Sequence, residues 1–152
     1  MLQAVVAIAR EAGLRPIIAV VPSGLELPAD VVTVRNDQPG SGMSRSLQLG
    51  IEGLPPGVSA TVVLLGDQPS LPVASVRAIV AARGTHPIVA ASATGLLQPP
   101  VLLERSAFGA AQELSGDIGL REIVRGHPEL VRSVSLEAIP PDVDTPADLE
   151  LL

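Results

Sequence analysis

Charge-free aliphatic runs closed by glycine or proline constrain the fold of this chain more than any other feature. The clearest is VVLLGDQPSLP at 62–72, where aliphatic residues lead to Gly66, a lone carboxylate at Asp67 and two prolines. Such runs are typical of strands buried on both faces of a parallel sheet. Ligands bind at the carboxyl ends of these strands, so Asp67 is a candidate functional residue, with a turn or helix cap as the alternative.

Helical and extended patterns alternate along the whole chain. Apolar spacing predicts helices at 2–12, 44–53, 72–82, 106–114 and 118–126, and a capping box predicts another helix from Thr145. Strands are predicted at 16–22, at 31–36, within the quoted run, at 88–93, at 100–104 and, on a sheet edge, at 130–136. This alternation indicates one α/β domain over residues 1–152, built on a mostly parallel sheet.

The composition excludes several classes of function. The chain has no cysteine, which excludes a thiolate nucleophile and cysteine-bound zinc, and no lysine, which excludes a Walker-type phosphate loop. A net charge of −6 and a single aromatic residue disfavour binding to nucleic acid or to an anionic membrane. No membrane span or signal peptide is recognisable, and we therefore expect a cytoplasmic protein.

The order of the predicted elements is unusual at its start. A doubly wound sheet commonly begins with a strand whose following loop binds phosphate, whereas this chain begins with a helix. We therefore expect an N-terminally truncated domain whose first βα unit is missing. Apolar surface on the 2–12 helix and the 16–22 strand should then be exposed, or covered by self-association.

A second group of carboxylates stands near the end of the sequence, in PPDVDTPADL at 140–149. Asp142 and Asp144 occupy alternate positions and would share one face of an extended segment. Asp67 and Asp144 each precede a proline-marked helix start, where carboxylates can hold Mg²⁺ together with the phosphates of a substrate. The alternative is that both are ordinary helix caps or turn residues.

Four motifs in order resemble the MobA-like NTP transferase family, most closely its molybdenum cofactor cytidylyltransferase branch. They are NDQPGSGMSRSLQLGI, VVLLGDQPSLP, QPPVLLERSAFGAAQELSGDIGLREIV and DVDTPADLELL, and together they extend over nearly the whole chain. The resemblance implies a Rossmann-like α/β fold with helices on both faces of the sheet. It also implies transfer of a nucleotidyl group from CTP or GTP to a phosphorylated acceptor such as molybdenum cofactor, with release of pyrophosphate.

The resemblance assigns catalytic and metal-binding roles to two carboxylates. Asp67 matches the family's metal aspartate, which holds Mg²⁺, with Mn²⁺ as a substitute, against the nucleotide phosphates. Asp144 matches the second carboxylate near that metal. A divalent cation would neutralise charge that builds up during attack at the α-phosphate.

The resemblance also implies residues that contact the nucleotide or the acceptor. Asn36, Gly42 and Ser46 match the segment beside these substrates, and Asp117 matches a Gly-Asp-x-Gly turn near the acceptor. The alternatives are structural: a turn asparagine, a loop glycine, a helix-capping serine and an N-cap aspartate for the 118–126 helix.

One family feature has no match in residues 1–152. The glycine-rich opening loop of the family, which is followed by a lysine and grips the triphosphate, is not found. We therefore expect the isolated chain to be inactive, and an extended version with that loop to be active. The alternative functions are a non-catalytic binding descendant of the fold and a related oxidoreductase, although no dinucleotide-binding Gly-x-Gly-x-x-Gly is present.

Overall fold

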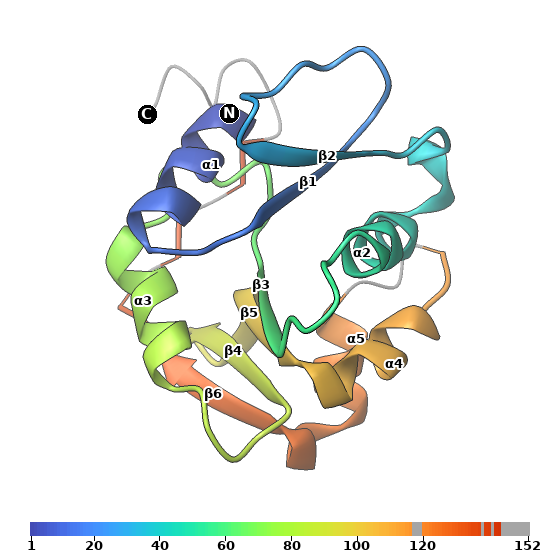
Figure 1. Ribbon diagram of the computed structural model, residues 1–152. Coiled ribbons are helices and arrows are strands. Elements are labelled where there is room, and N and C mark those ends of the chain that lie inside the picture. Colours follow the sequence, from blue (N-terminus) through green and yellow to red (C-terminus); the bar gives the residue numbers. More distant parts are fainter. Residues whose placement is uncertain (117–119, 138, 141, 144–152) are drawn as a thin grey trace.

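The computed structural model describes residues 1–116, 120–137, 139–140 and 142–143, and it shows strands between two layers of helices (Figure 1). The α-helices are α1 (Leu2–Glu11), α2 (Met43–Glu52), α3 (Val73–Ala81), α4 (Phe108–Gln112) and α5 (Leu120–Gly126). The strands are β1 (Ile17–Val21), β2 (Val31–Arg35), β3 (Ala60–Val63), β4 (Ile88–Ala93), β5 (Leu96–Glu104) and β6 (Val131–Ser135). The helix predicted from Thr145 lies outside the described residues.

The strands form two sheets. β1 and β2 pair in parallel, and the other sheet has the order β3-β5-β4-β6. In that sheet β4 and β6 are parallel, and β5 is antiparallel to both β3 and β4. Three of its four strands therefore share one direction, and β6 lies on an edge, as the alternating pattern at 130–136 predicts.

The strand predicted at 100–104 is longer and begins at Leu96, as the second strand of a hairpin with β4. Thr94 and Gly95 form the two-residue connection and both have positive φ, which is the backbone of a type I′ turn. Pro99 and Pro100 fall at the register shift between Ala90 and Ala91. Proline has no N–H for a sheet ladder and is tolerated at such an irregularity.

Helices cover both faces of the strands, as predicted. On one face α2, α4 and α5 pack on β4 and β5 through residues that include Ile51, Ala111 and Ile123. On the other face α3 packs through Ile79, and α1 packs on β1 and β2 through Val6. Because aromatic residues are nearly absent, this core is filled with valine, leucine, isoleucine and alanine.

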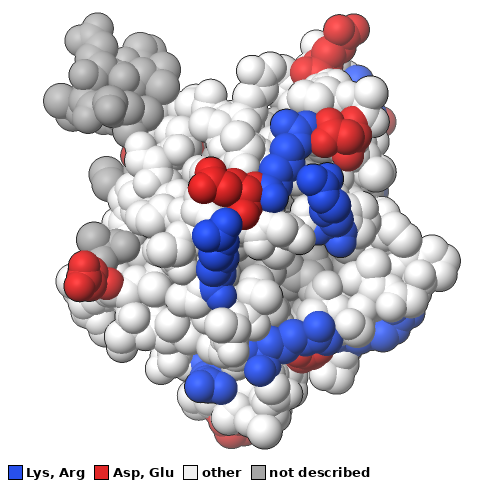
Figure 2. All heavy atoms as spheres, turned by 60° about the vertical axis from the view of Figure 1, so that its left-hand side comes forward, with Lys and Arg blue, Asp and Glu red and all other residues white. Residues whose placement is uncertain are grey.

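Arginine and acidic side chains are interspersed on the face that carries α1 and α3 (Figure 2). Arg10 of α1 pairs with Asp30, just before β2, and Arg83 pairs with Glu104 of β5. The hydrogen bond from Arg10 lowers the pKa of the Asp30 carboxyl, and the bond to Glu104 raises the pKa of Arg83. These pairs join neighbouring elements at the surface. Within the described residues, no helix has the length and apolar character needed to cross a membrane.

Candidate functional site

Asp67 follows β3, beyond the point where the sheet pairing of that strand stops. The last pair is Val63 with Val101 of β5, and the next position of β5 is Pro100, which lacks an N–H. Leu64 and Leu65 therefore continue outside the ladder and carry the chain to Asp67. The N-cap of α3 is Pro72, so Asp67 is not the cap of that helix.

The 142–143 segment lies directly against the turn that contains Asp67. The backbone N–H of Val143 donates a 2.9 Å hydrogen bond to the carbonyl oxygen of Asp67. The side-chain Nε2 of Gln68 donates a 2.8 Å hydrogen bond to Oδ1 of Asp142. Gln68 is only 3 % exposed, so this link holds two segments together that are 74 residues apart. Asp144 itself lies outside the described residues.

Asn36 and Ser46 are joined by a hydrogen bond. Asn36 is 4 % exposed, and its Nδ2 donates to the Ser46 hydroxyl at 3.1 Å, while its Oδ1 accepts from the Gln38 N–H at 3.0 Å. The second contact is an Asx turn, so the structural alternative for Asn36 describes part of its role. Ser46 lies inside the first turn of α2 and does not cap the helix.

Gly42 is the N-cap of α2, with φ 92° and ψ 171°. Residues other than glycine very rarely adopt this conformation, so the turn into α2 requires glycine here. Hydrogen bonds from Ser44 tie the same helix to the loop after α4: its hydroxyl and its N–H both donate to the carbonyl oxygen of Gly116, at 2.7 and 3.3 Å. Asp117, the next residue, lies outside the described part of the chain.

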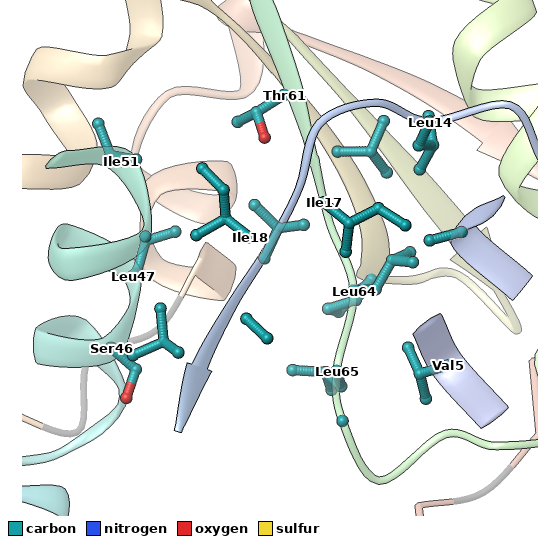
Figure 3. Close-up of a pocket in the computed structure, with 18 of the residues that line it drawn as sticks. Val5, Leu14, Ile17, Ile18, Ser46, Leu47, Ile51, Thr61, Leu64 and Leu65 are labelled. Carbon is teal, nitrogen blue, oxygen red and sulfur yellow. The ribbon is translucent and has the colours of Figure 1, made fainter. Parts of the chain in front are cut away.

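One cavity of about 840 Å³ connects these elements (Figure 3). Asp67, Asp142 and Ser46 all contribute to its wall, whereas Asn36 and Gly42 do not line it. Most of the remaining lining is aliphatic and comes from α1, β1, α2 and the chain from β3 to Leu65. The structure thus brings Ser46 and Asp67 to one cavity and connects Asn36 to it through Ser46.

The described residues offer few protein ligands for a metal ion. No group of three or more histidine, cysteine, aspartate or glutamate side chains is found in the part of the chain that the structure describes. Asp67 and Asp142 line the same cavity, and carboxylate oxygens are ligands that a hard cation such as Mg²⁺ accepts beside phosphate and water. Gln68 and Asp142 hold this corner together through their hydrogen bond. The sequence alone did not indicate this role, although the position of Gln68 directly after Asp67 could have suggested that it supports the site.

Residues 1–132 match the family model of the MobA-like NTP transferase domain. The chain belongs to this family. A curated relative, the phosphoenolpyruvate guanylyltransferase of Sphaerobacter thermophilus, is 33% identical over 123 residues, which are 76% of this chain and 57% of the relative. This MobA-like chain therefore spans little more than half the length of that relative.

Solved structures show the same fold. Rv0371c from Mycobacterium tuberculosis H37Rv has a TM-score of 0.85 at 24% identity, covering 99% of this chain and 81% of its own. A structure of Rv0371c in complex with manganese gives a TM-score of 0.81 at 26% identity, with 99% and 84% covered. The 2-C-methyl-D-erythritol 4-phosphate cytidylyltransferase of Thermus thermophilus gives 0.74 at 18% identity, with 99% and 85% covered. The predicted Rossmann-like α/β fold is confirmed.

Proposed function

We propose that this MobA-like domain serves nucleotidyl transfer from CTP or GTP to a phosphorylated small molecule, with release of pyrophosphate. The observation that carries the proposal is the contact between the Asp67–Gln68 turn and the 142–143 segment on the wall of a cavity that reaches Ser46 of α2. This corner lies beyond the carboxyl end of β3, where open α/β sheets bind ligands.

The proposed reaction needs positioning more than it needs a basic side chain. An oxygen of the acceptor phosphate attacks the α-phosphorus, the bond to the bridging oxygen of the β-phosphate breaks, and pyrophosphate leaves. The attacking oxygen is already anionic, so no histidine or cysteine is required, and correct placement accounts for much of the rate. A bound divalent cation would supply neutralisation of the charge on the phosphates.

The residues proposed for these roles are those that the family motifs indicate. Asp67 and Asp144 would hold the cation, Mg²⁺ or Mn²⁺. Asn36, Gly42, Ser46 and Asp117 would border the nucleotide and the acceptor. Carboxylate oxygens suit either cation, and the manganese complex of the 26% identical Rv0371c supports the use of a divalent metal.

Two acceptors are supported by different observations. The sequence motifs favour molybdenum cofactor, whereas the 33% identical relative is named for phosphoenolpyruvate. Both compounds carry a phosphate group that can attack the nucleotide. Transfer from α-³²P-labelled CTP and GTP to each compound, with separation of the products, would identify the donor and the acceptor for an active form of the enzyme.

Binding of the metal–nucleotide complex tests the proposed site without requiring turnover. We expect MnCTP or MnGTP to bind the wild-type chain about tenfold or more tightly than the Asp67→Asn variant, measured by isothermal titration calorimetry. Asp30→Asn is the matched control, because it makes the same chemical change at the surface pair with Arg10. Equal affinity of the wild type and the Asp67→Asn variant would contradict the proposal.

The 152-residue polypeptide on its own should transfer nucleotides very slowly. It contains no lysine and no match to the family's glycine-rich opening loop, which would orient the β- and γ-phosphates. Loss of one well-placed electrostatic contact can cost on the order of 10²–10³ in rate. We expect pyrophosphate release from CTP or GTP at the rate of a control without enzyme. Release well above that rate would show that other residues of this chain hold the triphosphate.

A further inference from the structure

The buried side chain of Asn36 lies where three segments of the chain meet. Asn36 directly follows β2, and its backbone N–H donates a 2.9 Å hydrogen bond to the carbonyl oxygen of Val21 at the end of β1. Its Oδ1 accepts from the N–H of Gln38, and its Nδ2 donates to the hydroxyl of Ser46 in α2. One side chain therefore connects the end of the β1–β2 sheet to the first turn of α2.

The backbone determines which way round the amide of Asn36 stands. A backbone N–H can only donate, so the atom of Asn36 that faces the N–H of Gln38 must be the carbonyl oxygen. The opposite orientation would place two donors against each other. Nδ2 therefore faces Ser46, and the oxygen of Ser46 is the acceptor in the 3.1 Å bond between them. The proton of the Ser46 hydroxyl takes no part in that bond.

This proton has no acceptor among the residues that the structure describes, where the bond from Asn36 is the only hydrogen bond of the Ser46 side chain. A serine inside a helix commonly donates to the carbonyl oxygen four residues earlier, which is that of Gly42 here. The contact with Asn36 holds the oxygen of Ser46 on the side of β2 instead. The hydroxyl proton is therefore available to a ligand.

Ser46 contributes to the wall of the 840 Å³ cavity, as Asp67 does, whereas Asn36 does not. Figure 3 shows Ile51, Leu47 and Ser46 in a row along α2, with Ser46 at the end that lies toward the carboxyl end of β1. Ser46 is also the one side chain with a hydrogen-bonding group that α2 contributes to this wall. Asn36 can therefore act on a ligand in the cavity through Ser46.

We propose that Asn36 is a positioning residue, which holds the Ser46 hydroxyl so that its proton is donated to an acceptor atom of the bound nucleotide. The proposal rests on the nucleotidyl transfer proposed above. Phosphate and carbonyl oxygens accept hydrogen bonds, whereas amino groups donate them. A hydroxyl whose oxygen already accepts from Asn36 favours an oxygen of the nucleotide over an amino group at this position.

A double-mutant cycle on the full 152-residue chain tests the proposal, with MnCTP and MnGTP as probes and isothermal titration calorimetry as the measurement. Ser46→Ala removes the proton, and we expect it to weaken binding about five- to tenfold. Asn36→Ser keeps a hydroxyl that can accept from the N–H of Gln38, but it has no amide donor to hold Ser46. We expect a similar loss from Asn36→Ser alone and little further loss when it is added to Ser46→Ala.

A second variant and a control separate this role from general support of the loop. Asn36→Asp keeps the acceptor for Gln38 and replaces the donor to Ser46 by an oxygen. Any general effect of its charge is common to both backgrounds and cancels in the cycle, so the same coupling with Ser46→Ala is expected. Ser23→Ala is the control, because it removes a 3.0 Å bond to Asp37 in the same region without touching Ser46. We expect it to leave binding unchanged in both backgrounds.

The outcomes that would overturn the proposal differ from failure of the proposed function. Equal losses from the Asn36 variants with and without Ser46→Ala would show that Asn36 acts independently of Ser46. Unchanged binding by Ser46→Ala would show that the hydroxyl does not contact the nucleotide. A lower melting temperature of Asn36→Ser with unchanged binding would leave Asn36 only its turn. Binding of neither MnCTP nor MnGTP by the wild type would contradict the proposed function, and this inference with it.

Discussion

At the residue scale, the entry into α2 depends on the backbone of Gly42. With φ 92° and ψ 171°, this residue occupies a region in which a side chain costs about 1–3 kcal/mol. We expect Gly42→Ala to lower the free energy of unfolding by that amount in urea denaturation. Gly40→Ala is the control, because a Cβ at Gly40 would have nothing within 4 Å. Equal stability of the two variants would contradict this account of the turn.

The Gln68–Asp142 hydrogen bond makes a second prediction at this scale. Gln68→Leu removes the 2.8 Å bond and keeps the buried volume, so we expect a loss of about 1 kcal/mol in stability. It should also weaken MnCTP binding about tenfold, since the 142–143 segment would be held less firmly at Asp67. Asp142→Asn is the control, because its amide oxygen still accepts from Gln68. Unchanged binding by the Gln68→Leu variant would show that the link does not position the site.

The sequence indicated Asp67 as a candidate because this carboxylate directly follows a charge-free run, and the structure places it on the wall of the cavity. It could not identify the Gln68–Asp142 bond, because partners 74 residues apart are brought together by the path of the whole chain. The partner of Ser46 could not be found from the sequence either. The sequence suggested a helix cap, but Gly42 caps α2 and Ser46 binds the side chain of Asn36.

At the element scale, α3 is attached to the sheet by one face. Ile79 is fully buried on β4 and β5, whereas the adjacent Val80 is 36 % exposed. We expect Ile79→Ala to cost about 2–5 kcal/mol, since it removes apolar contacts and leaves a cavity in a packed interior. Val80→Ala should cost far less, as judged by the midpoint of urea denaturation. Similar costs for both variants would mean that α3 packs with a different face.

Most elements could be located from the sequence, because buried aliphatic strands and amphipathic helices have different spacing. The strand predicted at 88–93 matches β4 residue for residue. The start of β5 was missed, because Pro99 and Pro100 are typical of a turn and here sit at an irregularity inside a strand. The same proline also limits the pairing of β3 with β5, which ends at Val63 because Pro100 has no N–H to donate at the next position.

At the scale of the whole molecule, α1, β1 and β2 are joined to the rest of the structure through helices, since β1 contacts α2 and α1 contacts α3. Between these two helices, the guanidinium of Arg77 in α3 donates a 2.6 Å hydrogen bond to the carbonyl oxygen of Glu11 in α1. Apolar residues of α1, β1 and β3 also line the cavity of about 840 Å³. A ligand that binds in this cavity, at the corner with Asp67, should therefore stabilise the whole chain.

The most direct test of the central claim, that Asp67 holds a cation together with a nucleotide, is the melting temperature with Mn²⁺ and CTP or GTP. At 100 times the dissociation constant, binding adds about 2.7 kcal/mol, which corresponds to a rise of about 5–10 °C for a chain of this size. We predict this rise for the wild type and for Asp30→Asn, and little or no rise for Asp67→Asn. An equal rise in the wild type and Asp67→Asn would contradict the claim.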